Sequence, residues 1–278
     1  MTPITVTTMV ENSVSMGVGL IAEHGLAFLI KSDDHTLLFD TGQGMALAHN
    51  AGVMNIDLKS VDTLVLSHGH YDHTGGIRNL LSLEKPFRMV AHPDAFSPKL
   101  ASFDRKTYHP IGNPVARDEI ANNGVDLVLS DQPVSLAPGM KTTGVVPEVT
   151  DFETIEGYFF TEENGQYVPD KLGDDLGVIL DTPSGTVLVL GCTHRGIINT
   201  LKHVESITGS RKLHAVMGGL HLGGADDAKM KQVIAALKEF EIDRFIIGHC
   251  TGAKAMIDLT NAFPGKVTPN TVGHNVTF

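Results

Sequence analysis

Runs of apolar residues divide the first half of the chain into strands and short helices. Segments that are rich in β-branched residues or continuously apolar are predicted to be strands. The polar residues 32–35 lie between two such segments, as in a hairpin. The helix before the histidine-rich segment is short, and the helix after it follows two glycines. The predicted strands are residues 4–10, 26–31, 36–39 and 61–66, and the predicted helices are residues 45–51 and 77–81.

The second half repeats this succession of predicted strands and helices, although its sequence does not repeat that of the first half. A second hairpin is predicted around residues 183–185, and residues 228–240 have the strongest amphipathic pattern in the chain. The predicted strands are residues 177–180, 186–190, 213–217 and 244–247, and the predicted helices are residues 197–204, 228–240 and 253–262. Each half supplies strands first and helices afterwards, which favours two packed sheets with helices outside.

Two segments, residues 97–125 and 139–176, show no regular pattern and are rich in polar and aromatic side chains. No linker divides the chain, so we expect one domain over residues 1–278 that carries these two irregular insertions. Long irregular segments in a compact domain are commonly lids or binding loops, and we expect them over the functional site. Plain surface decoration is an equal alternative.

The charge of the chain limits its partners. Thirty-two acidic residues against 21 basic ones give a net charge of -11 over 278 residues. Nucleic acid and anionic membranes attract basic surfaces, so neither is expected as a partner. No stretch is long and apolar enough to span a bilayer, and no signal peptide is expected from residues 1–6, so we expect a cytoplasmic protein. The oligomeric state is left open.

The candidate chemistry is concentrated directly after the predicted strand 61–66. Residues 67–76 read SHGHYDHTGG. Side chains two apart in an extended chain point the same way, so His68 and His70 are expected to bind one ion, while Asp72 and His73 on the following turn address a second. Three histidines and an aspartate within six positions are hard to explain by packing, because such groups are costly to bury without partners. Imidazole with carboxylate suits zinc, iron or manganese.

This motif resembles the His-x-His-x-Asp-His signature of the metallo-β-lactamase fold superfamily. The runs at residues 37–42, 187–192 and 246–249 resemble other strand ends of that superfamily and occur in the same order. The resemblance implies an α/β fold, a four-layer αββα sandwich in which two mixed β-sheets carry helices on their outer faces. Further segments, at residues 22–26, 147–153, 191–197, 218–222 and 248–252, are similar to a dihydropteroate-synthase-like subfamily. Members of that subfamily are named for making a dihydropterin–ribofuranosylaminobenzene phosphate conjugate.

The resemblance extends the candidate ligands to the ends of other strands. His249 ends an apolar strand and matches a late ligand histidine of the superfamily. Cys192 falls where a bridging aspartate or cysteine is usual, and a thiolate there favours zinc. A small buried cysteine beside a metal bound by His194 is the alternative. The expected ligand set for two divalent metal ions is His68, His70, Asp72, His73, Cys192, His194 and His249.

One expected histidine is missing, because residues 172–177, before the second hairpin, contain none. Asp174 or Asp175 substitutes for it, or His194 or His221 reaches in from another loop. We favour His194, which lies two residues after Cys192. His221 is expected either to bind metal or to contact substrate.

Other residues are assigned supporting roles. Asp40 is expected to orient a ligand imidazole, as metal-bound histidines usually require. His24, Arg195 and Thr251 are candidates for binding an anionic substrate, although ordinary polar loop residues explain them equally well.

These features predict a metal-dependent hydrolase or transferase that uses a hydroxide held by two metal ions, most readily zinc. A divalent ion lowers the pKa of bound water to roughly 7, so hydroxide is available at neutral pH. Asp72 would hold one ion and orient this nucleophile. The substrate is expected to be small and anionic or heterocyclic, including phosphate-bearing or pterin-like compounds. One alternative is a condensing enzyme that makes the pterin conjugate, and another is a metal-containing sensor or binding protein without turnover.

Overall fold

Two seven-stranded mixed sheets form the centre of the protein, in a computed structural model that describes residues 2–16 and 18–278. The first sheet has the order β18 (Asn275–Thr277), β1 (Thr5–Val10), β2 (Ala27–Lys31), β3 (Thr36–Phe39), β4 (Thr63–Val65), β5 (Arg88–Ala91) and β8 (Asp126–Leu129). The second has the order β17 (Val267–Pro269), β16 (Glu241–Gly248), β15 (Lys212–Gly219), β14 (Gly185–Leu190), β13 (Gly177–Thr182), β10 (Met140–Thr142) and β9 (Ser135–Ala137). In each sheet an antiparallel half joins a parallel half.

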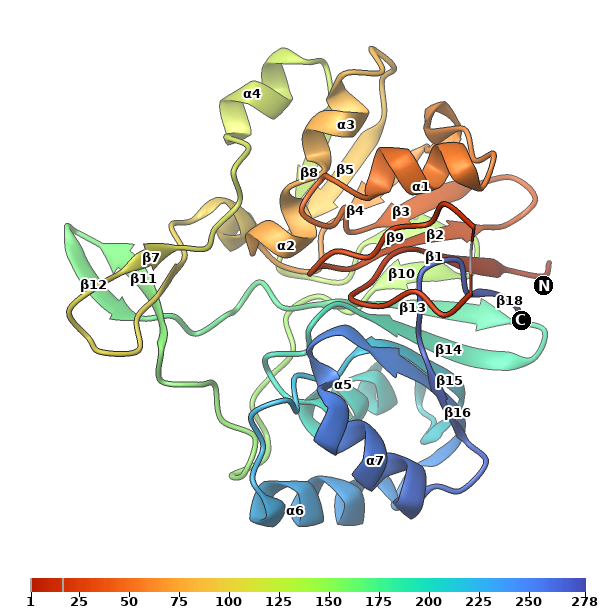
Figure 1. The fold of residues 1–278 in the computed structure, drawn as a ribbon, viewed down its shortest axis with the longest axis vertical. Coiled ribbons are helices and arrows are strands. Elements are labelled where there is room, and N and C mark those ends of the chain that lie inside the picture. Colours follow the sequence, from red (N-terminus) through yellow and green to blue (C-terminus); the bar gives the residue numbers. More distant parts are fainter. Residues whose placement is uncertain (1, 17) are drawn as a thin grey trace.

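Helices cover the outer face of each sheet (Figure 1). The first sheet carries α1 (Leu47–Val53), α3 (Ile77–Leu81) and α4 (Arg117–Asn122), and the second carries α5 (Ile197–Thr208), α6 (Asp227–Leu237) and α7 (Ala253–Ala262). The order of layers is therefore helix, sheet, sheet, helix, which confirms the predicted αββα sandwich. No helix within the described residues is both long and apolar enough to cross a membrane.

Strand β2 shows why this arrangement follows from the sequence. Phe28 and Ile30 belong to the core between the two sheets, whereas Ala27 and Leu29 pack toward the helices of the first sheet. All four side chains are buried, because alternate residues of a strand point to opposite faces and both faces are covered here. A continuous apolar run is therefore the expected pattern for such a strand.

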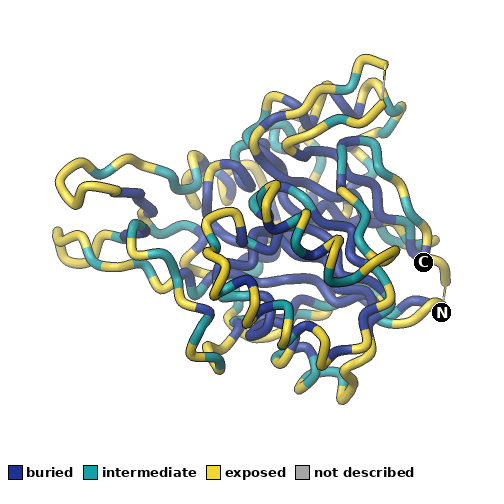
Figure 2. Tube along the Cα trace, turned by 60° about the horizontal axis from the view of Figure 1, so that its bottom comes forward, coloured by how far each residue is buried: buried dark blue, intermediate teal, exposed yellow. Residues whose placement is uncertain are grey.

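A small third sheet projects from the sandwich as an arm. It has the order β12 (Gln166–Pro169), β11 (Phe159–Glu163), β6 (Leu100–Ala101) and β7 (His109–Pro110), and Figure 2 shows that it is largely exposed at its tip. The two insertions were expected to be irregular, but the strands of this arm lie within residues 97–125 and 139–176. The prediction missed β6 and β7 because strands of two residues leave no alternating pattern, and it missed β11 and β12 because their sequences, FFTEE and QYVP, do not alternate regularly between apolar and polar residues.

The predicted elements agree closely with the observed ones near the site and less well at the edges. The helix 253–262 has the observed bounds of α7, whereas the helix 228–240 ends at Leu237 because the chain turns there into β16. Several short elements were not predicted, namely α2 (Tyr71–Thr74), α4, β5, β8, β9, β10, β17 and β18.

Glu23 fixes the loop that supports the histidine motif. Its buried carboxylate accepts hydrogen bonds from the backbone N–H groups of four consecutive residues of the loop after β3, at 3.0, 3.3, 3.1 and 3.1 Å. This loop packs directly against Gly75, where a Cβ would lie only 2.3 Å from the carbonyl oxygen of Gln43. The loop and the motif therefore depend on each other for their position.

Replacement of Glu23 by alanine should destabilise the fold, because four backbone donors lose a buried acceptor. We expect the free energy of unfolding to fall by about 2–4 kcal/mol in urea denaturation. Glu163→Ala is the matched control, since this exposed glutamate makes no side-chain hydrogen bond among the described residues and should change stability by less than about 0.5 kcal/mol. Equal stability of the two variants would contradict this account.

Candidate metal centre

The histidine motif lies where the central strand β4 has just ended. His70 has an extended backbone, with φ -75° and ψ 149°, and α2 begins at the next residue. The single turn of α2 carries Asp72 and His73 back toward His68. All four side chains are buried and face the gap between the ends of the two sheets.

Three imidazole rings converge on one side of this gap. Nε2 of His68 lies 3.0 Å from Nδ1 of His70 and 3.3 Å from Nε2 of His194. A nitrogen of His68, a nitrogen of His194 and Sγ of Cys192 all lie within 4.8 Å of one another. The atoms of His68, His194 and Cys192 are close enough together to bind one divalent metal ion, whereas His70 contacts His68 and is not part of that group.

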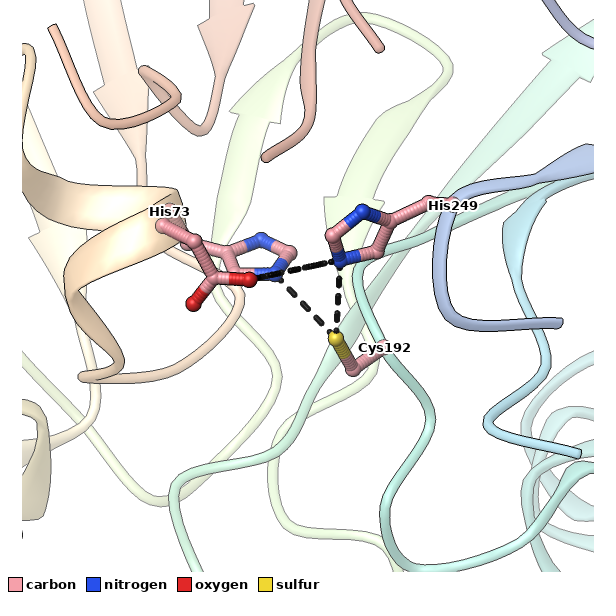
Figure 3. A group of neighbouring side chains, drawn as sticks. His73, Cys192 and His249 are labelled. Carbon is pink, nitrogen blue, oxygen red and sulfur yellow. Dashed lines mark hydrogen bonds and ion pairs between the residues drawn. The ribbon is translucent and has the colours of Figure 1, made fainter. Parts of the chain in front are cut away.

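A second group converges on the same sulfur atom (Figure 3). Sγ of Cys192 lies 3.1 Å from Nε2 of His73 and 3.3 Å from Nε2 of His249. The carboxylate of Asp72 is 3.6 Å from Nε2 of His73 and 3.5 Å from Nε2 of His249. Cys192 therefore belongs to both groups and stands between them.

Further buried polar groups hold these ligands in place. The carboxylate of Asp40, which is fully buried, accepts hydrogen bonds from Nδ1 of His73 at 2.7 Å and from the backbone N–H and hydroxyl of Ser67, both at 2.7 Å. Nδ1 of His249 lies 2.8 Å from Oδ1 of Asn12, and its backbone N–H donates to the carboxylate of Glu11. Both imidazoles are thus oriented through Nδ1, which leaves Nε2 for the centre.

Burial controls the protonation of the ligands. Burial lowers the pKa of four histidines well below the usual value, and nearby cationic groups lower it further. These are His68, His70, His194 and His249. Burial also opposes the charged form of His73, but the carboxylates of Asp72 and Asp40 outweigh it and raise its pKa to about 9. Burial raises the pKa of the Cys192 thiol. A cation at the centre would favour neutral His73 and a Cys192 thiolate, so metal binding should release protons.

The segment that lacks the expected histidine supports the motif from outside. Oδ2 of Asp174 accepts the backbone N–H of Gly69 at 2.7 Å, and Oδ1 accepts the ammonium group of Lys99 at 2.8 Å. Gly69 itself is required, because a Cβ there would lie 2.5 Å from the carbonyl oxygen of Ala95. Asp174 thus holds the turn between His68 and His70 and is not among the converging ligand atoms.

Asp175 and Arg195 are occupied by contacts with each other and with the backbone. Asp175 accepts the backbone N–H of Arg195 at 2.8 Å, and burial raises its pKa to about 7. The guanidinium of Arg195 donates to the carbonyl oxygens of Val146 and Lys171 at 2.9 and 2.8 Å. The structure does not bring either side chain to the centre.

The remaining predicted residues lie at different depths. His24 stands at the mouth, where its half-exposed ring stacks on His249 at 5.4 Å and lies 3.7 Å from the carboxylate of Asp72. His221 packs against His194, with 4.1 Å between the ring centroids. Thr251 is fully buried and its hydroxyl accepts the backbone N–H of Leu220, so it does not reach a substrate in this conformation.

A cavity of about 180 Å³ opens onto the centre, and its walls are aromatic. Tyr71, Phe103, Tyr158 and Phe159 line it, with ring centroids 4.9 Å apart for Phe103 and Tyr158 and 4.5 Å apart for Tyr158 and Phe159. A larger groove of about 850 Å³ lies elsewhere, along β1 and β2, and contains none of the converging ligands. The smaller cavity is therefore the candidate substrate-binding cavity, because of the two only its lining includes the converging side chains.

Several residues of the site were not predicted from the sequence. Cys250 and the aromatic residues of the arm line the cavity, and Glu11, Asn12 and Glu156 contact histidines at or beside the centre. Only Cys250 carried a signal, since it directly follows His249.

The chain matches the family model of the metallo-β-lactamase superfamily over residues 20–249. It belongs to that superfamily. It is also 34% identical over 259 residues to the 7,8-dihydropterin-6-methyl-4-(β-D-ribofuranosyl)-aminobenzene-5'-phosphate synthase of Methanocaldococcus jannaschii, a match that covers 89% of this chain and 87% of that one. An uncharacterised protein of the same organism is 31% identical over 242 residues, which are 86% of this chain and 88% of that protein.

A solved structure has the same fold along nearly the whole chain. Tm1679, described as a metal-dependent hydrolase of the β-lactamase superfamily, superimposes with a TM-score of 0.83 at 25% identity and covers 98% of both chains. Together, the family model, the synthase and this structure confirm the predicted membership of the dihydropteroate-synthase-like subfamily of the metallo-β-lactamase superfamily. Its relatives include a protein named a synthase and one described as a hydrolase.

The Asp40 contacts predict a loss of metal affinity when the carboxylate becomes an amide. In Asp40→Asn the hydrogen bond to Nδ1 of His73 weakens, and we expect the affinity for zinc to fall by about 10- to 100-fold in a chelator competition titration. Asp181→Asn is the control, because that side chain on β13 makes no hydrogen bond among the described residues. Unchanged affinity in Asp40→Asn would count against a ligand role for His73.

Proposed function

We propose that two divalent metal ions, most readily zinc, bind on either side of Cys192. His68, His70 and His194 would hold one ion, and Asp72, His73 and His249 the other. The single observation that carries this proposal is the convergence of His68 and His194 on one hand, and of Asp72, His73 and His249 on the other, on one sulfur atom. Thiolate and imidazole ligands favour zinc, with iron and manganese as alternatives. Such ions would supply Lewis acidity toward a phosphoryl, carbonyl or leaving-group oxygen.

We propose further that the protein is a condensing enzyme that joins a dihydropterin to a ribofuranosylaminobenzene phosphate. The synthase of M. jannaschii supports this proposal, since the similarity runs over 89% of the chain. In such a condensation the aromatic amine nitrogen bonds to the methylene carbon on the pterin, pyrophosphate leaves that carbon, and the amine loses a proton. The metal ions suit this reaction because a pyrophosphate leaving group is anionic.

The aromatic walls of the cavity suit a flat heterocycle. Phe103 is 79% exposed, which is unusual for a phenylalanine and leaves one ring face free beside Tyr158. A pterin ring could stack there with its substituent toward the metal centre. His24 at the mouth supplies a polar group near the carboxylate of Asp72.

Hydrolysis is the second candidate function. Tm1679 is described as a hydrolase, and it covers 98% of this chain. The same ligand groups would activate water against an ester or phosphodiester. The two candidates differ in whether an amine or water attacks, and that difference can be measured directly.

The test is to incubate the zinc-loaded protein with 6-hydroxymethyl-7,8-dihydropterin pyrophosphate and 4-(β-D-ribofuranosyl)aminobenzene 5'-phosphate. We expect the conjugate to appear by liquid chromatography and mass spectrometry together with one equivalent of pyrophosphate. His68→Ala and Asp72→Ala should each lower the rate by at least 100-fold, because each removes a ligand.

Glu163→Gln, outside the centre, is the control and should keep the rate of the unsubstituted protein. Release of pyrophosphate without the conjugate would assign hydrolysis instead. Full activity of Asp72→Ala, with no loss of bound zinc, would reject the metal-dependent mechanism altogether.

Phe103→Ala should weaken substrate binding more than turnover. Loss of one stacking face costs roughly 1 kcal/mol, so we expect KM for the pterin substrate to rise about 5-fold with little change in kcat. Tyr167→Ala is the matched control, because Tyr167 is also an exposed aromatic residue of the arm but stacks on Tyr108, outside the residues that line the cavity. An equal change of KM in both variants would show that the arm, and not the ring face, is responsible.

A further inference from the structure

A second cluster of metal-binding side chains lies beside the centre and is not used by the proposed function. It consists of Glu156, His221 and Cys250, which come from the loop before β11, the loop after β15 and the turn η3 (His249–Thr251). A ring nitrogen of His221, Sγ of Cys250 and Sγ of Cys192 all lie within 4.8 Å of one another. The three sequence positions are far apart, so the fold brings them together.

The two ring nitrogens of His221 have different surroundings. Nε2 lies 3.4 Å from Oε2 of Glu156, whereas Nδ1 is shielded from solvent and has no hydrogen-bond partner among the described residues. A buried ring nitrogen without a partner is costly. A carboxylate beside one ring nitrogen is the usual support of a metal-bound histidine, and the thiols of Cys250 and Cys192 are the other candidate ligand groups close to this ring.

The sulfur of Cys250 has polar neighbours on two residues, His221 and Cys192. Sγ lies 3.4 Å from the carbonyl oxygen of Cys192, which is a weak contact for a thiol. A Cβ added at Gly219 would lie 2.6 Å from this sulfur, so the glycine leaves the space that Cys250 occupies. The thiol is thus held next to Cys192 rather than directed into solvent.

The geometry points to a further metal site, in which Cys192, Cys250 and His221 bind an additional thiophilic divalent ion of the zinc class. Two sulfurs and one imidazole form a three-ligand set of the kind that catalytic zinc sites use, with a fourth position left open. All three residues line the aromatic cavity, so the open position would face the substrate. This proposal depends on the proposed function only through Cys192, which both sites would share.

Glu156 connects this site to the inner centre. One of its carboxylate oxygens lies within 4.8 Å of a nitrogen of His221 and of a nitrogen of His194. Nδ1 of His194 is also buried without a hydrogen-bond partner among the described residues, while Nε2 faces His68. Glu156 is therefore placed to orient both imidazoles, and we assign it a positioning role.

The experiment is a cobalt titration of protein from which metal has been stripped by a chelator. We expect the unsubstituted protein to bind one equivalent of Co²⁺ more than Cys250→Ser or His221→Gln. The absorption of the sulfur-to-cobalt bonds in the near ultraviolet should fall in Cys250→Ser and disappear when Cys192 is replaced as well. His214→Gln, a half-buried histidine that pairs with Asp243, is the matched control and should keep every equivalent.

The outcomes separate this inference from the proposed function. If Cys250→Ser and the unsubstituted protein bind the same number of ions and show the same absorption, the further site is absent although the inner centre stands. If neither protein binds cobalt, both proposals fail.

Thiol reactivity of the unsubstituted protein provides a test that does not depend on a folded variant. Cys192 and Cys250 are the only cysteines in the sequence. We expect an aromatic disulfide reagent to modify both thiols in the stripped protein and neither in the zinc-loaded protein. Rapid modification of Cys250 in the zinc-loaded protein, located by peptide mass spectrometry, would overturn the proposal.

Discussion

The arrangement of the protein depends on the cost of burying many polar side chains at one point. Imidazoles, a carboxylate and a thiol meet where β4, β14 and β16 end, and desolvation opposes the charged form of almost every one of them. Such groups need either hydrogen bonds or a cation to remain together without water. The surrounding sandwich supplies the hydrogen bonds through Asp40, Asn12 and Asp174, each of which fixes one part of the centre.

The two halves of the fold explain how residues so far apart in the chain reach this point. In each sheet, an antiparallel half leads into a parallel half, so that several strands run in one direction and end at the same edge. The sheets pack face to face through apolar side chains such as Phe28, Phe39, Val178 and Val189. The packing therefore sets the spacing between the motif after β4 and the ligands after β14 and β16, and the chemistry relies on the core.

Much of this could be predicted from the sequence, because strong local patterns lie close to the site. The apolar strand before His68, the glycines around the motif and the run that ends at His249 each carry a local signal. The small arm could not be predicted, since β6 and β7 have only two residues each and β11 and β12 show no regular alternation of apolar and polar positions. Glu23, Glu156 and Asn12 could not be found either, because their roles depend on contacts with residues that are distant in the sequence. Thr193, which precedes His194, has a φ of 66°. A residue other than glycine is held in this left-handed region by tertiary contacts, so the local sequence does not reveal the backbone conformation before His194.

The sandwich and the arm contribute different parts of the candidate site, and this difference affects which reaction the site favours. The sandwich provides the candidate metal ligands, and these would serve hydrolysis and condensation equally well. The arm provides Phe159 and, beside it, Phe103 and Tyr158, which cover one side of the cavity with apolar surface. A hydrolase must admit water to the centre, whereas a condensing enzyme must keep water from competing with an amine. An aromatic wall that a flat substrate can complete serves the second requirement, because the bound ring itself would displace the remaining water. Selection between the two reactions is therefore expected to reside in the insertions, and the arm is the part of the molecule in which relatives with different reactions should differ most.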